Sequence, residues 1–395
     1  MNQTKIDLVI LAGGKGSRLN QYLGNLPKPM VKINKKSFLS YLINNASIYN
    51  FNKIYIMTGY RSAIIKNKFH KKEFNFVPVE CIKEKKPLGT GGCLSLLKKK
   101  ISKEFIILNG DTFVDIDFQK LIKKKIHYNE ILMVLAKKKQ NENSYQLTSL
   151  SIKNNRVTFH QKGNYFNAGI YKLHKKNIKN FTNQFLSFEN DFLKKKINEK
   201  KVTPFINKNL FIDIGTPKTL KKSHIIFKNH FSKPAAFFDR DGTINFDYEY
   251  VHKIQNFHFK PGILRLLKYL TKQNYYIFIV TNQAGIAKKK FLLSDFKKLH
   301  IQLKNILLKH NIKIHDVIYC PYHPKALIKK YKKNSNFRKP GNLMIETLKK
   351  KWDINVKKSF FIGDQKKDFL AAKKSNLNFY YAENNFIINL KKKLN

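Results

Sequence analysis

The sequence predicts an α/β protein with two domains. Its 395 residues are enough for two or three domains of ordinary size. Short apolar segments alternate with stretches of helical periodicity, which is typical of sheets built from parallel strands. The same order occurs twice: an apolar segment is followed by a glycine-rich or acidic loop and then by a helix. It begins at 8–19 and at 235–245. The two halves share no repeated sequence, which indicates a fusion of two different domains.

Buried strands and helices are expected along both halves. The expected strands are 8–12, 53–59 and 105–111 in the first half and 235–238, 275–282 and 359–364 in the second. Residues 38–49 and 263–272 have helical periodicity between them. A lysine-rich stretch, 221–234, ends in proline and is the expected boundary, which places the domains at 1–228 and 229–395.

The composition excludes several classes of protein. The formal net charge of +53 is of the kind that nucleic-acid or membrane-surface binders carry. Here the lysines are spread along the whole chain, so we predict small anionic substrates and neither nucleic-acid nor membrane partners. No apolar run approaches the ~18 residues of a membrane span. Three cysteines, Cys81, Cys93 and Cys320, without a signal peptide indicate a reducing compartment, the cytoplasm.

Acidic residues in the second half predict a phosphoryl-transfer site. Asp239 and Asp241 follow an apolar strand two positions apart, and a Gly-Thr turn comes next. The first carboxylate can attack phosphorus while the second handles the proton of the leaving oxygen. Ligands of open α/β sheets bind beyond the carboxyl ends of the strands. The polar residues of three further motifs, at 280–282, 338–340 and 363–368, should therefore converge there. These residues are Thr281, Asn282, Lys339, Asp364 and Asp368.

This half resembles the haloacid dehalogenase (HAD) superfamily, which implies a Rossmann-like parallel sheet. In that pattern Asp239 is the nucleophile and Asp241 the general acid/base. Thr281 binds the transferring phosphoryl group and Lys339 neutralises it. The resemblance implies Mg²⁺, with Asp239, Asp241 and Asp364 as its ligands and Asp368 as a supporting carboxylate.

Longer motifs narrow the resemblance. The stretches 239–263, 281–287, 319–324 and 338–340 are similar to D,D-heptose 1,7-bisphosphate phosphatases, over nearly all of 234–385. Histidinol-phosphate phosphatases share several of these motifs and are the alternative. The resemblance implies substrate contacts for Asn282, Gln283 and Arg338.

One departure from that family concerns zinc. Zinc-containing members carry Cys-x-His and Cys-x-Cys pairs before the Arg-Lys-Pro motif. The positions of these pairs hold Cys320 and Tyr322, then Ser335 and Phe337, with His323 one place late. A structural zinc site takes four nitrogen or sulfur ligands, so we predict that this chain holds no zinc.

Glycines and cations follow the first strand of the N-terminal half. Gly13, Gly14, Lys15 and Arg18 fit neither the dinucleotide-binding nor the Walker A spacing. Backbone amides with cations nevertheless make a cradle for phosphates. Other motifs at or near strand ends contain Lys28, Gly89, Gly91, Asp111, Lys162, Asn167, Gly169 and Asp213.

These motifs resemble the sugar-1-phosphate nucleotidyltransferases over about 4–225, which implies a GT-A-like, Rossmann-like mixed sheet. The resemblance assigns the triphosphate to Gly13, Gly14, Lys15 and Arg18, the reacting phosphates to Lys28, the base or sugar to Gly89 and Gly91, and Mg²⁺ to Asp111 and Asp213. It assigns the sugar phosphate to Lys162 and the sugar hydroxyls to Asn167 and Gly169. The usual acidic residue before that lysine is Gln161 here.

Together the two resemblances predict one pathway. A heptose 1,7-bisphosphate phosphatase makes heptose 1-phosphate, and a nucleotidyltransferase consumes a sugar 1-phosphate. We therefore expect a bifunctional enzyme of nucleotide-heptose synthesis for a surface polysaccharide such as lipopolysaccharide, with GTP as the nucleotide by analogy. The alternatives are another sugar or base, a sugar-nucleotide sensor with inactive sites, and a nucleic-acid-binding protein. The anomer and the oligomeric state stay open.

Overall fold

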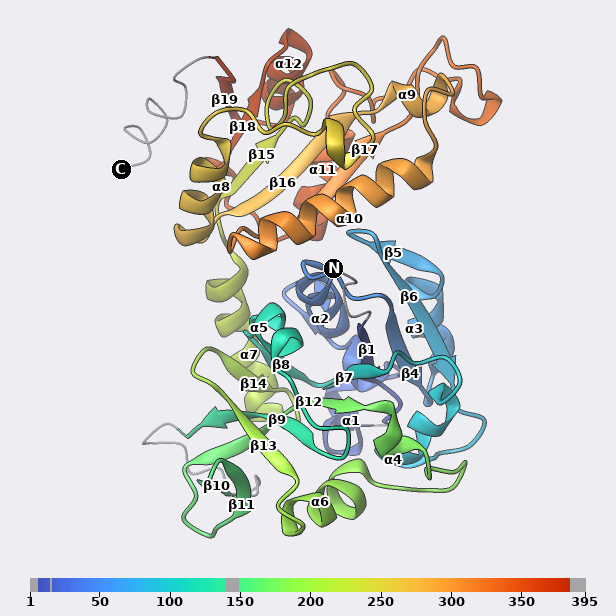
Figure 1. Ribbon diagram of the computed structural model, residues 1–395, viewed down its shortest axis with the longest axis vertical. Coiled ribbons are helices and arrows are strands. Elements are labelled where there is room, and N and C mark those ends of the chain that lie inside the picture. The colour runs from blue at the N-terminus through green and yellow to red at the C-terminus, as the bar shows by residue number, and fades with distance from the viewer. Residues whose placement is uncertain (1–5, 15, 139–148, 384–395) are drawn as a thin grey trace. The chain divides into compact units, whose positions relative to one another are not determined.

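Figure 1 shows the computed structural model of the chain, which describes residues 6–14, 16–138 and 149–383. The chain divides into two compact units, Met1–Ile225 and Ile226–Asn395, called here the first and second unit. The division falls inside helix α7 (Pro217–Phe231), which overlaps the stretch 221–234, and the bounds 1–228 and 229–395 stay a prediction. Among the described residues, no helix combines the length and hydrophobicity that a membrane crossing requires.

The first unit is built on a mixed sheet. Its main path runs β11-β10-β12-β7-β1-β4-β6-β5, and β9 and β13 join it beside β12. Strands β7, β1, β4 and β6 are parallel, whereas β12 is antiparallel to β7. The bounds are β1 Ile6–Leu11, β4 Ile54–Thr58, β5 Lys72–Phe74, β6 Val77–Lys83, β7 Glu104–Asn109, β9 Ile131–Lys137, β10 Leu150–Lys153, β11 Arg156–Phe159, β12 Tyr165–His174 and β13 Val202–Asn207.

Two small sheets and several short helices complete the first unit. Strand β14 pairs antiparallel with β8, and β2 pairs with β3. The strands are β2 Lys32–Ile33, β3 Lys36–Ser37, β8 Thr112–Val114 and β14 Phe211–Asp213. The helices are α1 Asn20–Leu23, α2 Phe38–Ser47, α3 Ser62–Phe69, α4 Gly89–Gly92, α5 Phe118–Lys123, the π-helix η5 Phe188–Leu193 and α6 Lys194–Asn198.

The second unit is built on a parallel sheet in the order β17-β16-β15-β18-β19. Its strands are β15 Ala235–Phe238, β16 Tyr276–Asn282, β17 Asp316–Cys320, β18 Phe360–Gly363 and β19 Asn378–Tyr381. Its helices are α8 Ile263–Lys272, α9 Ala284–Ala287, α10 Leu293–Lys309, α11 Leu343–Lys351 and α12 Lys366–Lys374. The predicted fold class, a mixed sheet followed by a parallel one, is confirmed.

Alternating side chains explain why the strands of the second sheet are apolar throughout. One face contributes Phe238, Ile279 and Ile362 to a core that also contains leucines of α8 and α10. The opposite face carries Phe237, whose ring lies 5.2 Å from Phe278. A parallel strand buried on both faces has no solvent side, so its sequence has no polar alternation.

Candidate active sites

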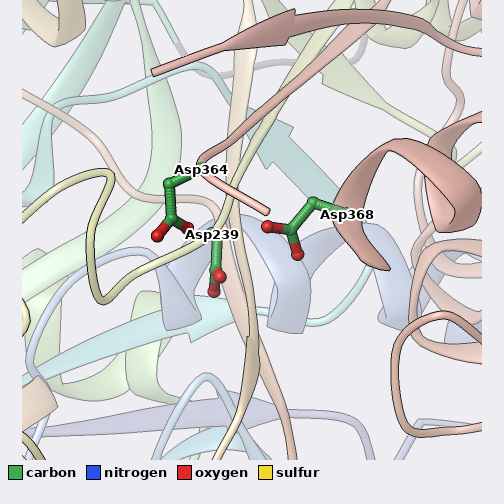
Figure 2. Close-up of side chains that lie close together, drawn as sticks. All are labelled: Asp239, Asp364 and Asp368. Carbon is green, nitrogen blue, oxygen red and sulfur yellow. The ribbon is translucent and has the colours of Figure 1, made fainter. Parts of the chain in front are cut away.

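Three carboxylates converge at the carboxyl end of the second sheet. Asp239 follows β15, Asp364 follows β18, and Asp368 lies in the first turn of α12. Each offers one oxygen, and these atoms lie within 4.8 Å of one another (Figure 2). Because β15 and β18 are adjacent and parallel, the residues that follow them meet at one edge. Sheet topology therefore assembles a cluster from residues far apart in sequence.

A buried lysine bridges two of these carboxylates. The Nζ atom of Lys339 lies 2.8 Å from Oδ1 of Asp239 and 2.7 Å from Oδ1 of Asp368. Burial alone would lower the pKa of Lys339, but the two carboxylates outweigh it and raise the pKa above its ordinary value. The ammonium is therefore charged at neutral pH, and it lies beside the predicted nucleophile.

The main chain of Lys339 is held by the last residue of β16. The Asn282 side chain accepts a hydrogen bond from the Lys339 N–H at 3.0 Å and donates one to the Lys339 carbonyl at 3.0 Å. Sequence reasoning assigned Asn282 to the substrate. The structure instead engages its amide with the loop that carries Lys339, and the substrate contact stays a prediction.

The cluster has the properties of a cation site. Burial raises the pKa of Asp239 to about 6; Lys339 opposes the shift and Asp368 adds to it. Burial and then the charge of Asp368 raise the pKa of Asp364. Oδ1 of Asp364 is buried and has no hydrogen-bond partner among the described residues. Oxygen ligands of this kind suit Mg²⁺, so the residues fit the predicted metal.

Glycine makes room for one of these carboxylates. Gly242 has φ +79°, and a Cβ there would collide with the Asp364 carboxylate. A left-handed backbone next to a side chain in this position is available to glycine at little cost and to other residues only with strain. The Asp-Gly-Thr turn is therefore part of the site and not merely a connection.

Asp241 lies in the same loop but its carboxylate has other partners. Nη2 of Arg240 is 2.7 and 2.8 Å from its two oxygens, and Asn245 and Gln283 donate to it at 3.0 and 2.9 Å. Burial would raise the pKa of Asp241, but the charge of Arg240 and the hydrogen bonds from Asn245, Arg240 and Gln283 together outweigh it, and the pKa is lowered. Asp241 is not among the three converging carboxylates. Its predicted role as a metal ligand therefore stays a prediction.

Gln283, which the sequence assigned to the substrate, and Arg240 both contact predicted catalytic groups, and the substrate contact of Gln283 stays a prediction. Gln283 is buried and donates from Nε2 to Asp241 and to Oγ1 of Thr281, each at 2.9 Å. The side chain thus aligns two predicted catalytic groups. Arg240 is wholly buried and was not singled out, although its place between Asp239 and Asp241 was a signal that could have been used.

The loop before Lys339 is packed through aromatic and cationic side chains. Nζ of Lys333 lies 3.9 Å from the ring centroid of Tyr322, and Nη1 of Arg338 donates to the Tyr322 carbonyl at 3.5 Å. Cys320 is buried, and burial raises the pKa of its thiol. Within the described residues neither Cys320 nor His323 belongs to a cluster of three or more metal-ligating side chains. The absence of zinc remains a prediction.

In the first unit, the carboxyl ends of β7, β1, β4 and β6 border a cavity of about 780 Å³, called here the larger cavity. Five residues that the sequence assigned to nucleotide or metal line it: Gly13, Gly14, Lys28, Gly89 and Asp111. Gly91 is not among the lining residues; it packs against Leu186. Arg18 is exposed and does not line the larger cavity, and Lys15 lies outside the described residues.

Two predicted metal ligands come together beside a lysine. Nζ of Lys28 lies 2.5 Å from Oδ2 of Asp111. Pairing of β14 with β8 sets Asp213 opposite Thr112, whose Oγ1 donates to Asp213 at 3.2 Å. Burial and then the charge of Asp111 raise the pKa of Asp213. Two neighbouring carboxylates that repel each other in this way favour a bound cation.

A second cavity of about 470 Å³, the smaller cavity, adjoins the first. The predicted sugar-binding residues Asn167 and Gly169 line it together with Asp213. Lys162 does not line it; it is exposed in the turn before β12 and its sugar-phosphate role stays a prediction. A different lysine, Lys194, lines this cavity.

Asn109 and Glu189 belong to the walls of both cavities. Glu189 accepts hydrogen bonds from Asn109 at 3.2 Å, Thr90 at 3.3 Å and the Tyr171 hydroxyl at 3.5 Å. Sequence reasoning missed Glu189 because it lies in π-helix η5 and not at a strand end. Its three partners come from three separate segments, and no local pattern indicates them.

Two family models match the chain. One, described as nucleotidyl transferase, matches residues 8–228, and one described as polynucleotide kinase 3 phosphatase matches residues 234–394. A D-glycero-β-D-manno-heptose-1,7-bisphosphate 7-phosphatase of Rhodopseudomonas palustris is 39% identical over 141 residues, which are 36% of this chain and 78% of that protein.

Two further proteins are similar to the N-terminal part. A D-glycero-α-D-manno-heptose 1-phosphate guanylyltransferase of Aneurinibacillus thermoaerophilus is 32% identical over 225 residues, 55% of this chain and 96% of that protein. The crystal structure of HddC from Yersinia pseudotuberculosis covers 56% of this chain and 99% of its own, with 33% identity and a TM-score of 0.49. The chain therefore belongs to the nucleotidyl transferase family over residues 8–228 and, in its second unit, to the HAD-like phosphatase family of the Rhodopseudomonas enzyme, and it is a nucleotidyltransferase and a phosphatase in one polypeptide.

Proposed function

We propose that the chain carries out two successive steps of nucleotide-heptose synthesis. The second unit removes the 7-phosphate of D-glycero-D-manno-heptose 1,7-bisphosphate. The first unit joins the resulting heptose 1-phosphate to GMP from GTP and releases pyrophosphate. The product would supply a surface polysaccharide such as lipopolysaccharide, and the cytoplasm, where nucleoside triphosphates are present, is the expected compartment.

One observation carries this proposal: the two relatives named for heptose phosphates match different units of one chain. The product of the reaction named for one is the kind of compound that the other consumes. The two names differ in the anomer, β for the phosphatase and α for the guanylyltransferase. Hydrolysis at C7 leaves C1 unchanged, so both units have to accept the same anomer for the steps to connect.

The phosphatase step begins at Asp239. Its carboxylate oxygen forms a bond to phosphorus as the bond from phosphorus to the sugar oxygen breaks, and the leaving oxygen takes a proton from Asp241. Water then attacks the aspartyl phosphate, gives its proton to Asp241 and releases phosphate. Lys339 and Thr281 hold the phosphoryl oxygens. For this role Asp241 has to bind a proton and exchange its contact with Arg240, which lowers its pKa in the present arrangement, for one with the substrate oxygen.

Mg²⁺ fits this site through Asp239 and Asp364, with Asp368 supporting Lys339. When bound, the ion offsets the repulsion between the nucleophile and the phosphate. Lys339 contributes to the same end, because its charge faces Asp239. Arg338, half-buried beside Tyr322, is suited to the second phosphate of a bisphosphate, since a guanidinium binds phosphate oxygens in pairs.

The transferase step requires positioning more than acid–base chemistry. An oxygen of the heptose 1-phosphate attacks the α-phosphorus of GTP, and the bond to the leaving pyrophosphate breaks. Gly13 and Gly14 offer close backbone approach to the phosphates, and Lys28 neutralises developing charge. Asp111 and Asp213 fit Mg²⁺, which would shield the phosphates from one another. The smaller cavity, next to these carboxylates, is the place for the sugar.

The test is incubation of the purified chain with each anomer of heptose 1,7-bisphosphate, GTP and Mg²⁺, with the products read by mass. We expect GDP-heptose, phosphate and pyrophosphate from one anomer. ATP, CTP and UTP serve as comparison nucleotides, and histidinol phosphate and a 3′-phosphorylated oligonucleotide as comparison phosphatase substrates. Faster turnover of a comparison nucleotide would overturn the assignment of GTP, and faster turnover of a comparison phosphate ester would overturn the assignment of heptose bisphosphate.

A further inference from the structure

An aromatic ring lies at the wall of the larger cavity without being buried in the core. Phe185 is 72% exposed and lines this cavity together with Gly89 and Pro87. Phenylalanine is ordinarily buried, and exposing its ring to water loses the free energy that burial would contribute. A ring that lines a cavity in this way is therefore a candidate for contact with a ligand.

The position of the ring is defined by its loop. The neighbouring Leu186 donates from its N–H to the Leu88 carbonyl at 2.9 Å, and its carbonyl accepts from the Gly91 N–H at 2.8 Å. The N–H of Phe188 donates to Oγ1 of Thr90 at 2.8 Å. The loop is thus hydrogen-bonded to helix α4 and to the residue before that helix, directly after Phe185 in the chain. A wall held in this way loses little conformational entropy when a ligand arrives.

Glycine allows the ring to approach the main chain. A Cβ on Gly89 would lie 3.2 Å from Cε2 of Phe185 and 2.5 Å from the Leu186 carbonyl oxygen. Gly89 also has φ +72°, which favours glycine. The Gly-Thr-Gly-Gly segment and the Phe185 loop therefore form one fitted surface on the edge of the cavity.

The order of the strands gives the cavity a direction. Neighbouring strands run β7, β1, β4 and β6, so the residues that follow them cross the cavity from Asp111 to Glu84. Three strand spacings of about 4.8 Å separate the two sides by roughly 14 Å. The Lys28–Asp111 pair lies on the β7 side. Gly89, with Phe185 against it, belongs to the segment that follows β6.

We propose that the ring of Phe185 is the surface on which the nucleobase of the nucleotide substrate stacks. The inference rests on the proposed nucleotidyl transfer by the first unit, whose reacting phosphates belong beside Lys28 and Asp111. A nucleotide oriented that way directs its base toward the β6 side. The sugar acceptor is not the partner of this ring, because Asn167 and Gly169 line the smaller cavity and Phe185 does not.

Stacking of a base on an aromatic ring does not depend on the hydrogen-bonding edge of the base. Phe185 is therefore expected to strengthen the binding of every nucleoside triphosphate, and the choice of base belongs to other groups. Removing the ring should weaken the binding of GTP by roughly 5- to 100-fold. It should leave the binding of a ligand that has phosphates but no base unchanged.

The experiment measures dissociation constants on the full chain by titration calorimetry, for GTP and for inorganic triphosphate, each with Mg²⁺. Phe185→Ala should weaken GTP and not triphosphate, and Phe185→Trp should bind GTP at least as tightly as the unchanged chain. Tyr128→Ala is the matched control, because Tyr128 is 49% exposed and lines neither the larger nor the smaller cavity. It should change neither constant.

Three results would overturn the inference. GTP binding by Phe185→Ala equal to that of the unchanged chain would show that the base does not contact the ring. Equal weakening of GTP and triphosphate would show that Phe185 acts only through the loop. Absence of nucleotide binding by the unchanged chain would remove the proposed function of the first unit and this inference with it. The first two results differ from this one, because in both of them the unchanged chain binds GTP.

Discussion

Asp239 and Lys339 have properties that neither has in water. Both are almost wholly enclosed, and the ammonium of Lys339 lies within 2.8 Å of the Asp239 carboxylate. Their attraction keeps the lysine charged, whereas burial makes the aspartate easier to protonate than usual. A bound phosphate would place its negative charge beside the Lys339 ammonium, and its cation would place positive charge beside the Asp239 carboxylate.

Exchange of single carboxylates should separate the two activities. Asp239→Asn removes the nucleophile, so phosphate release should fall by about 10⁴-fold or more while nucleotidyl transfer is unchanged. Asp111→Asn should reduce nucleotidyl transfer and leave phosphate release unchanged. The two rates are measured separately, with heptose bisphosphate and with heptose 1-phosphate plus GTP. A folded variant that loses both activities would contradict the two-site assignment.

Gly242 should tolerate no side chain. In Gly242→Ala the methyl group meets the Asp364 carboxylate and the positive φ is strained, which should lower the free energy of unfolding by about 1–3 kcal/mol and reduce phosphate release. Gly24→Ala is the control, since φ is +53° there and the space around it is open. If both variants retained full activity, close packing at Gly242 would have no part in the site.

At the scale of elements, the loop after η7 (Lys329–Tyr331) reaches the site because β16 holds it. The last residue of that strand, Asn282, binds both main-chain polar groups of Lys339. A strand of a parallel sheet is among the most rigid parts of a unit, so its end is a good support for a catalytic group on a loop. Asn282 is accordingly a positioning residue for Lys339.

Asn282→Ala should lower kcat for phosphate release by on the order of 10²-fold, because a lysine displaced by about 1 Å no longer matches the transition state. Asn282→Asp, which keeps one acceptor, should recover part of the rate. Asn342→Ala is the matched control: its amide also donates to a main-chain carbonyl, that of Lys374, and to the Ser375 hydroxyl, which lie outside the carboxylate cluster. An effect on KM alone would instead support the substrate contact first assigned to Asn282.

A buried histidine at the start of β17 makes the second unit sensitive to acid. His315 packs 5.0 Å from the Tyr276 ring and accepts a hydrogen bond from the Ile277 N–H at 3.1 Å. Burial, with the charges of Lys233 and Lys313, holds its pKa well below 6.5. The folded chain therefore binds fewer protons than the unfolded chain. Stability from His315 is present above pH 6.5 and is lost as the pH falls below it.

His315→Asn keeps a hydrogen-bond acceptor and cannot be protonated in this range. We expect the variant to be less stable at pH 7, through lost packing, but to lose less further stability between pH 6.5 and pH 5 than the unchanged chain. Urea unfolding of the second unit, followed at several pH values, measures both effects. Parallel curves for the two proteins would show that His315 does not titrate on unfolding.

At the scale of the whole molecule, two units with different sheets carry two different sites. Each cluster of candidate residues is complete within its own unit: the converging carboxylates lie in the second, and both cavities named above lie in the first. The two activities are thus expected to be independent in everything except the compound that connects them.

A mixture of two variants, each lacking a different one of the two activities, should therefore make the final product. Asp239→Asn and Asp111→Asn chains, combined with heptose bisphosphate, GTP and Mg²⁺, should form GDP-heptose, because heptose 1-phosphate made by one chain diffuses to the other. Each variant alone should form none. If each retained its own activity but the mixture made no product, the intermediate would not leave the chain that produced it.

The sequence by itself determined the fold class, the two-domain organisation and the chemical type of each site. Apolar strands, their order and the polar residues that follow them are local features, and the strands of Asp239 and Asp364 are recognisable from short segments. Strand ends of parallel sheets meet at one edge, so local patterns were enough to predict which motifs share a site. The confirmed families and fold follow from this level.

Only the tertiary structure decided what the individual side chains touch. It turned Asp241 toward Arg240, engaged Asn282 with the main chain of Lys339, and brought Glu189 between two cavities. The contacts of Asn282 and Glu189 join residues 57 and 80 positions apart, and all three contacts depend on how loops and helix ends pack on the sheet. Periodicity and motif spacing carry no information about that packing, because they describe one segment at a time.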